Sequence, residues 1–167
     1  MRDTIHMIAV LVTVTIFSAA VLTYVNEITQ PRIIENRDNE VSKALSTVLP
    51  DATGFREIQI EGDAITKLYE GDDEGRVGWV IIAEGIGFAD TIELAIGVDP
   101  DYRVTGVVVL DQKETPGLGA RITEPAFLAQ FVGEMGDIDA ITGASISSDA
   151  ATAIVRSALS ELREGMS

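Results

Sequence analysis

The chain has no cysteine and a single histidine among its 167 residues. Without cysteine it can form neither disulfide bonds nor a thiolate nucleophile, and it cannot hold an iron–sulfur cluster on cysteines alone. The one histidine, His6, lies in the hydrophobic N-terminal segment, so the rest of the chain has none for haem, zinc or a Ser-His-Asp triad. Any redox chemistry would therefore need an organic cofactor.

Positive charge is scarce as well. The sequence has 12 lysines and arginines against 27 acidic residues, which gives a net charge of −15. Arg2 and Asp3 cancel within residues 1–26, so the whole excess belongs to residues 27–167. An acidic domain is unsuited to nucleic acid or to an anionic membrane surface, and we predict no nucleic-acid partner.

Carboxylates alone could bind calcium or magnesium, and this stays open as an alternative. Their densest run, Asp72 to Glu74 between Gly71 and Gly75, lacks the loop spacing of an EF-hand. We expect a solvated hairpin turn there and predict no metal site.

One long hydrophobic run is present. Residues Ile5 to Val25 contain no Asp, Glu, Lys or Arg and, as a helix, would extend roughly 30 Å, the thickness of a bilayer core. The alternatives are a buried core helix and a signal peptide cleaved near Ser18-Ala19-Ala20. Because the hydrophobic sequence continues past that site, we favour an uncleaved anchor that contacts membrane lipid through residues 5–25. The flanking basic residues favour an outward-facing domain only weakly.

After the anchor, the hydrophobic period indicates first a helix and then strands. Helical spacing runs from Glu27 to Leu49, is interrupted at Pro31 and ends at Pro50, which predicts a stalk helix. The segments with strand character that follow are 57–61, 65–69, 77–83, 91–98 and 104–110.

The last part of the sequence returns to helical patterns. A short helix is expected from Glu124-Pro125 and a final helix from about Asp149 to Glu164. Closely spaced strands followed by helices predict an α+β fold with a mainly antiparallel sheet. We divide the chain into an anchor helix (1–26), a stalk helix (27–50) and a folded domain (51–167).

The run 139–145 combines small residues with a hydroxyl ahead of the final helix. Gly143-Ala144 lets backbone and ligand approach closely, and Ser147 or Ser148 is expected to cap the helix. A helix N-terminus carries roughly half a positive charge, which favours a phosphate group. Ser145 could hold that phosphate by a hydrogen bond or by a covalent phosphoester, and an ordinary turn is the remaining alternative.

Two glycine-bearing loops accompany this run, at 84–88 and at Lys113–Gly119. In the second loop Pro116 fixes φ, while two glycines permit left-handed backbone around Leu118. Such a loop can present Leu118 and bare amides to a flat ligand; the alternative is a tight turn with a buried leucine. Neither loop is a dinucleotide fingerprint, because no βαβ unit surrounds it.

Together, the hydrophobic N-terminal segment, the Lys113–Gly119 loop and the Asp139–Ser145 run resemble the FMN-binding subunits RnfG and NqrC. RnfG belongs to ion-translocating ferredoxin:NAD oxidoreductase complexes, and NqrC to the sodium-pumping NADH:quinone reductase; the short chain is more similar to RnfG. The resemblance implies an FMN-binding domain at 51–167 on the extracytoplasmic side of the membrane. It also implies a non-autonomous electron-transfer subunit whose partners are other redox subunits, with no catalytic residue or diffusible substrate of its own.

In that family, FMN is attached through its phosphate to a hydroxyl that ends an Asp-x-x-Ser/Thr-Gly-Ala-Thr motif, and a flavin transferase installs it from FAD. The resemblance assigns Asp139 as the leading acid, Thr142 as the first hydroxyl, Gly143 and Ala144 as the small residues, and Ser145 as the attachment residue. Most members have threonine at the last position, and a serine hydroxyl can form the same ester.

The resemblance also implies walls around the isoalloxazine ring of the flavin. The residues it assigns to them are Gly85, Gly87, Glu114, Thr115, Pro116, Gly117, Leu118 and Gly119. Lys113 and, less strongly, Arg121 are candidates for stabilising negative charge on reduced flavin; the alternative for both is a solvated surface charge. Trp79 is expected in the core.

Two other interpretations stay open. One is an NqrC-type subunit of a sodium-translocating quinone reductase. The other is a cofactor-free surface or interaction module, with a hydrophobic anchor and an acidic head, in which Asp139 to Ser145 would have no special use.

Overall fold

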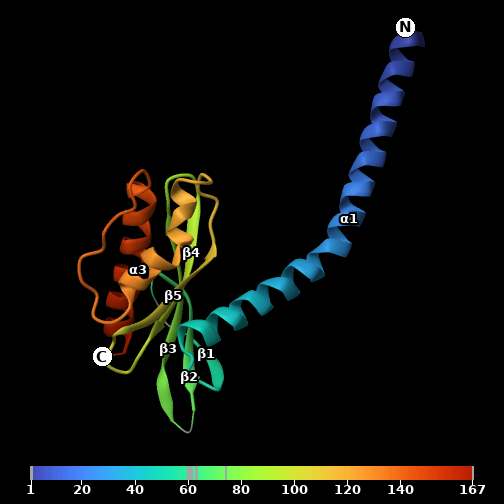
Figure 1. Cartoon of the computed structure of the whole chain (residues 1–167). Helices are drawn as coiled ribbons and strands as arrows, with labels where there is room; N and C mark the ends of the chain where they lie inside the picture. Colours follow the sequence, from blue (N-terminus) through green and yellow to red (C-terminus); the bar gives the residue numbers. More distant parts are fainter. Residues whose placement is uncertain (1, 60–61, 63, 74, 167) are drawn as a thin grey trace. The chain divides into compact units, whose positions relative to one another are not determined.

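A computed structural model describes the chain except residues 1, 60–61, 63, 74 and 167 (Figure 1). The chain divides into two compact units, residues 1–39 and residues 40–167. The first unit is helical, and the second contains the end of the same helix, the sheet and the remaining helices.

Helix α1 (Arg2–Val48) is long and apolar enough to cross a membrane. An 18-residue window within Thr4–Val48 has a mean hydropathy of 2.4, and none of that window is buried within the described structure. The hydroxyls of Thr13 and Thr15 each donate to the carbonyl four residues earlier, so these polar groups are satisfied inside the helix. The chain is thus anchored to the membrane by its N-terminal helix.

The expected interruption at Pro31 is wrong, because α1 continues through this residue. Proline removes one backbone donor and crowds the carbonyl four residues before it, which weakens a helix locally without always ending it. The helix ends at Val48, two residues before Pro50, as expected from the sequence.

Five antiparallel strands follow in the order β1-β2-β3-β4-β5, so each strand pairs with its neighbours in the sequence (Figure 1). Their bounds are β1 Gly54–Ile58, β2 Ile65–Asp72, β3 Arg76–Ile86, β4 Thr91–Val98 and β5 Val104–Asp111. The predicted α+β fold with an antiparallel sheet is confirmed. The first strand is displaced from the predicted 57–61, because Gly54 pairs with Asp72 and Ile58 with Leu68. Residues 60 and 61 lie outside the described part.

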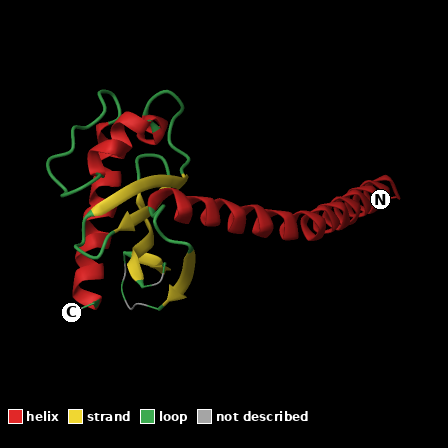
Figure 2. Ribbon diagram, turned by 60° about the horizontal axis from the view of Figure 1, so that its bottom comes forward, coloured by secondary structure: helices red, strands yellow, loops and turns green. Residues whose placement is uncertain are grey.

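The two faces of the sheet are covered by different helices, because successive residues of a strand point to opposite faces. On one face, Ile81 and Ala83 of β3 belong to a core cluster with helix α3 (Ser145–Gly165). On the other face, Val80 and Ile82 cluster with the last turns of α1. Figures 1 and 2 show α3 running along the sheet.

Three short helical turns join the sheet to α3: η1 (Gly119–Thr123), α2 (Pro125–Leu128) and η2 (Ala129–Phe131). The predicted short helix at Glu124-Pro125 is confirmed, with proline in the first turn of α2. Phe127 and Phe131 pack edge to face in the core, with their ring centroids 5.3 Å apart. Trp79 is also buried, and its ring stacks on that of Tyr102 with the centroids 5.5 Å apart. The prediction that Trp79 lies in the core is confirmed.

Candidate functional site

A cavity of about 340 Å³ lies at the N-terminal end of α3. Three segments meet there: the turn after β3, the loop between β5 and η1, and the first turn of α3. The lining residues are Phe88, Thr115, Leu118, Gly119, Gly143, Ala144, Ser145, Ile146 and Ser147. The structure therefore brings the Lys113–Gly119 loop and the Asp139–Ser145 run together at one place.

Helix α3 begins at Ser145, earlier than the predicted Asp149, and Ala144 is its N-cap. The prediction that Ser147 or Ser148 caps the helix is wrong, because both lie inside its first turn with their side chains buried. The Ser148 hydroxyl donates to the Ala144 carbonyl at 2.9 Å and accepts from the Ile141 amide at 3.1 Å. Alanine has no side-chain oxygen, so no side-chain cap covers the first amides of α3.

Ser145 is an exposed first-turn residue at the cavity wall. The preceding Gly143 has a φ of +84°, a conformation that favours glycine. A Cβ added at Gly143 would lie 3.6 Å from Leu118 Cδ2, so Leu118 lies across this turn. The hydroxyl of Ser145 and the uncapped amides of α3 can together receive a phosphate group.

The loop before η1 presents an apolar side chain to the cavity. Gly117 has a φ of +76°, and the Leu118 amide donates to the Thr115 carbonyl at 3.1 Å. This turn leaves Leu118 51% exposed, so the alternative of a buried leucine is wrong. Phe88, which is also largely exposed, lines the cavity as well. The small residues and the two apolar side chains fit a flat aromatic ligand, and the volume lies within the ~300–1,000 Å³ usual for small-ligand sites.

Glu114 lies behind the cavity wall and is only 4% exposed. Its Oε2 accepts from the Ser147 hydroxyl at 2.5 Å, and its Oε1 accepts from the Ala89 amide at 3.0 Å. Burial, the largest single influence, raises the pKa of Glu114. The hydrogen bonds from Ser147 and from the backbone of Ala89, Asp90 and Phe88 together outweigh it and hold the pKa below the ordinary value.

Two glycines that the resemblance assigns to the flavin wall have packing roles in the structure. Gly85 belongs to β3 rather than to a loop, and a Cβ there would collide with Ile154 of α3. Gly87 follows the strand, and a Cβ there would collide with Glu114 and Ile92. Neither glycine lines the cavity, whereas their neighbour Phe88 does. Sequence reasoning did not assign Phe88 to the site. The feature that could have indicated it is an aromatic residue in a glycine-bearing turn.

The two basic candidates are each paired at the surface. Lys113 Nζ lies 3.2 Å from Asp90 Oδ2, and Arg121 Nε lies 2.8 Å from Glu124 Oε1. The Thr91 amide and then Lys113 lower the pKa of Asp90, and the Glu124 carboxylate raises the pKa of Arg121. Neither Lys113 nor Arg121 lines the cavity.

The start of the 139–145 run is held by a residue that sequence reasoning missed. The Gln130 side chain accepts from the Asp139 amide at 2.8 Å and donates to the Asp139 carbonyl at 3.3 Å. Arg121 Nη1 lies 3.5 Å from the Thr142 carbonyl. Asp139, Thr142 and also Pro116 and Gly117 lie near the cavity in sequence but are not among its lining residues.

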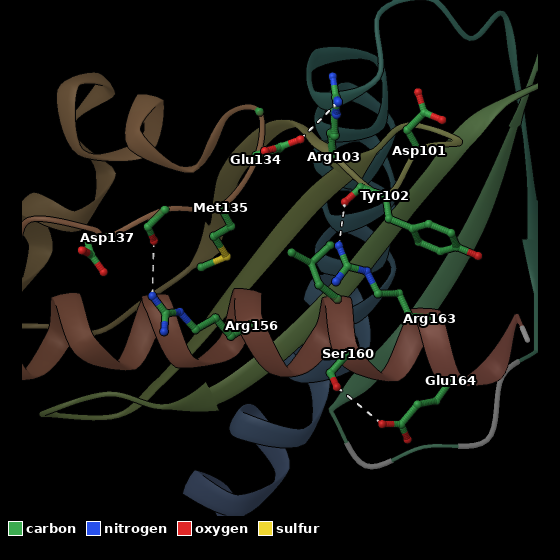
Figure 3. A pocket seen from close by; sticks show the side chains of 13 residues that line it. Asp101, Tyr102, Arg103, Glu134, Met135, Asp137, Arg156, Ser160, Arg163 and Glu164 are labelled. Atoms are coloured by element: carbon green, nitrogen blue, oxygen red, sulfur yellow. Dashed lines mark hydrogen bonds and ion pairs between the residues drawn. The ribbon is translucent and has the colours of Figure 1, made fainter.

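A second hollow, of about 1,100 Å³, lies along the C-terminal half of α3 (Figure 3). Its arginines are engaged: Arg103 with Glu134 at 3.1 Å, and Arg156 with the Gly136 carbonyl at 3.3 Å. In Figure 3, Arg103 points toward Glu134, and Arg156 points from α3 toward the segment that carries Met135 and Asp137. None of the residues predicted for the site lies there. Within the described part of the chain, no group of His, Asp or Glu side chains is arranged to hold a metal ion.

Comparisons with known proteins identify the family of the chain. Residues 87–160 match the family model of the FMN-binding domain. The G subunit of the ion-translocating oxidoreductase complex of Methanosarcina acetivorans is 32% identical, over 95% of this chain and 96% of that protein. The G subunit of the proton-translocating ferredoxin:NAD(+) oxidoreductase complex of Clostridium ljungdahlii is 27% identical, over 96% of this chain and 93% of that protein.

A solved structure shares the fold. The C subunit of the Na(+)-translocating NADH-quinone reductase from Parabacteroides distasonis matches with a TM-score of 0.56 and 18% identity, over 78% of this chain and 92% of that one. At this identity the likeness concerns the fold alone.

Proposed function

This chain belongs to the family of G subunits of ion-translocating oxidoreductase complexes, and from that premise we propose that it is an electron-transfer subunit carrying covalently bound FMN. Its relatives are named as subunits of complexes that couple oxidoreduction to ion translocation. FMN would supply the electron chemistry, and this chain would position it. The redox partners would be other subunits of the same complex, because the relatives are named as subunits of multi-subunit complexes.

The single observation that carries the proposal is the place of Ser145. Its exposed side chain borders the 340 Å³ cavity at the uncapped start of α3. We propose that Ser145 Oγ forms a phosphoester with FMN. A flavin transferase would deliver the FMN unit from FAD: the new bond joins Ser145 Oγ to the FMN phosphorus, the pyrophosphate bond breaks, AMP leaves and the hydroxyl proton is released.

The other residues of the site would hold the cofactor without reacting. The amides of the first turn of α3 would donate hydrogen bonds to the phosphate and stabilise its negative charge. Leu118 and Phe88 would contact the flat ring, while Gly119 and Ala144 leave room beside it. Thr142 and Asp139 would serve recognition by the transferase, because their side chains do not line the cavity.

We propose the same domain organisation as the sequence predicted: an anchor at 1–26, a stalk at 27–50 and the FMN-binding domain at 51–167. The domain would lie on the extracytoplasmic side. A covalent bond is suited to that location, because a cofactor that dissociated there would be diluted and lost. The interpretation as a quinone-reductase subunit has only the shared fold in its support.

Attachment is tested by co-expressing the chain with a flavin transferase and viewing flavin fluorescence in the denatured protein band. Wild type and Ser145→Thr should fluoresce, and Ser145→Ala should be dark. Ser157→Ala is the matched control, because Ser157 is an exposed serine on the same helix. A dark wild-type band beside an active transferase would contradict covalent attachment. If that protein also bound no FMN, the cofactor-free module would be the better interpretation.

A further inference from the structure

We propose that Glu114 is the positioning residue of this site: its buried carboxylate joins the three segments that form the cavity and places a negative charge directly behind them. The inference rests on the proposed function, because it concerns how the same cavity receives FMN. It gives Glu114 a role different from that of a wall in contact with the flavin.

The hydrogen bonds of Glu114 reach two segments that are distant in sequence. Through Ser147 the carboxylate holds the first turn of α3, and through Ala89 it holds the turn after β3. Glu114 itself belongs to the third segment, and its own amide donates to Gln112 Oε1 at 2.7 Å. Ser147 and Phe88, the neighbour of Ala89, both line the cavity.

The surrounding glycines make room for this carboxylate. A Cβ at Gly119 would lie 2.5 Å from Glu114 Oε2 and 2.5 Å from Ser147 Oγ. A Cβ at Gly87 would collide with Glu114 Oε1. These two glycines are therefore explained by close packing around Glu114, one beside each oxygen of its carboxylate.

A carboxylate suits these donors better than a neutral amide does. The donors directed at Glu114 are the Ser147 hydroxyl and backbone amides of the 88–90 turn. An ionised carboxylate accepts at both oxygens in charge-assisted hydrogen bonds. In glutamine only Oε1 accepts, and the NH₂ group can meet Ser147 only if it donates to Oγ, which reverses that hydrogen bond and makes it neutral. Because the hydrogen bonds favour the charged form, Glu114 is ionised at neutral pH.

This charge has an electrostatic consequence for a bound flavin. Reduction adds negative charge to the cofactor, and a nearby carboxylate in a poorly solvated place opposes it. Glu114 therefore lowers the reduction potential of the flavin, in addition to shaping the cavity.

The test uses the full chain, co-expressed with a flavin transferase, with Glu114→Gln as the main variant. Glu161→Gln is the matched control: Glu161 lies on α3 and accepts from the Ala64 and Ile65 amides at 2.9 and 3.2 Å, away from the cavity. The readouts are the rate of covalent flavin loading, the thermal stability of the unloaded chain and the midpoint potential of the loaded fraction.

We expect Glu114→Gln to slow flavin loading by about tenfold or more, the effect of losing one charge-assisted hydrogen bond. The midpoint potential of its loaded fraction should shift to a more positive value. Glu161→Gln should lose stability but load at the wild-type rate with an unchanged potential. If Glu114→Gln fails to fold, Ser147→Ala replaces it: this variant keeps the charge, so loading should slow while the potential stays close to wild type.

Two results would overturn the inference. One is wild-type loading and potential in Glu114→Gln. The other is slow loading that follows lost stability equally in both glutamine variants, which would make Glu114 a purely structural residue. Wild-type chain that takes up no flavin would instead contradict the proposed function, and the inference with it.

Discussion

Ser145 and Ser147 stand two positions apart in the first turn of α3, yet their surroundings differ. Ser145 is exposed, whereas Ser147 is 2% exposed and donates to Glu114. A hydroxyl that must attack a phosphorus atom held by another enzyme has to be accessible, and of these two serines Ser145 alone meets this condition.

The flavin should therefore be found on Ser145 alone. Proteolysis of the loaded chain followed by mass spectrometry of the fluorescent peptide should place the added mass on Ser145, with none on Ser147. In Ser145→Ala the mass should disappear rather than move to Ser147. Flavin on Ser147 would show that the helix start opens before modification.

Glu114 also predicts how stability depends on pH. Its folded pKa lies below the ordinary value of 4.5, so its stabilising effect is complete above that value and is lost as the pH falls through the folded pKa. The thermal stability of wild type should fall between about pH 5 and about pH 3 more steeply than that of Glu114→Gln, because glutamine at position 114 has no proton to bind. Parallel curves for the two proteins would contradict this assignment.

The residues of the site were only partly predictable from the sequence. The positions of Ser145 and Leu118 follow from local patterns, a helix start and a proline–glycine turn. The role of Glu114 does not, because its partners Ser147 and Ala89 are distant along the chain and only the fold brings them together. Gly85 was misleading for the same reason: what it makes room for is Ile154, a side chain of a helix far along the sequence.

At the scale of elements, a polar contact joins the end of α1 to the sheet, in addition to the apolar cluster there. The Thr105 hydroxyl of β5 donates to the Val48 carbonyl at 2.5 Å, and a Cβ at Gly97 would collide with that same carbonyl. Helix C-termini leave carbonyls without intrahelical partners, and this one finds its donor on the sheet.

Thr105→Val keeps the shape of the side chain and leaves the Val48 carbonyl without its donor. It should destabilise the domain by about 1 kcal/mol, as expected for one lost hydrogen bond. Thr91→Val, at an exposed position on β4, should change little. The measurement is chemical denaturation of the detergent-solubilised chain, and equal midpoints for the two variants would contradict the contact.

Elements with a strong hydrophobic period were predicted well, and their ends less well. The strands from 65 onward and the short helix at Pro125 are present, because alternation and proline placement are local signals. The start of α3 was misjudged, since serines normally cap helices and here the residue at the cap is Ala144. Pro31 does not interrupt α1, because a long helix can continue past one missing hydrogen bond.

At the scale of the whole molecule, the absence of cysteine makes the topology easy to measure. Single-cysteine variants Ser157→Cys, on the folded domain, and Thr4→Cys, at the start of α1, both replace exposed residues in a background without thiols. A membrane-impermeant maleimide added to intact cells should label Ser157→Cys, and should label Thr4→Cys only after lysis. The reverse pattern would place the domain in the cytoplasm.

The order of the strands has a consequence for how the protein is made. Because each strand pairs with its sequence neighbour, the sheet can assemble in the order of translation. Its face carrying Ile81 and Leu94 stays uncovered until α3 has been synthesised, and α3 is also the element that brings Ser145. Under the proposed function, a flavin transferase would therefore meet a complete acceptor only on chains whose core has closed, and cofactor loading would then also act as a check on folding.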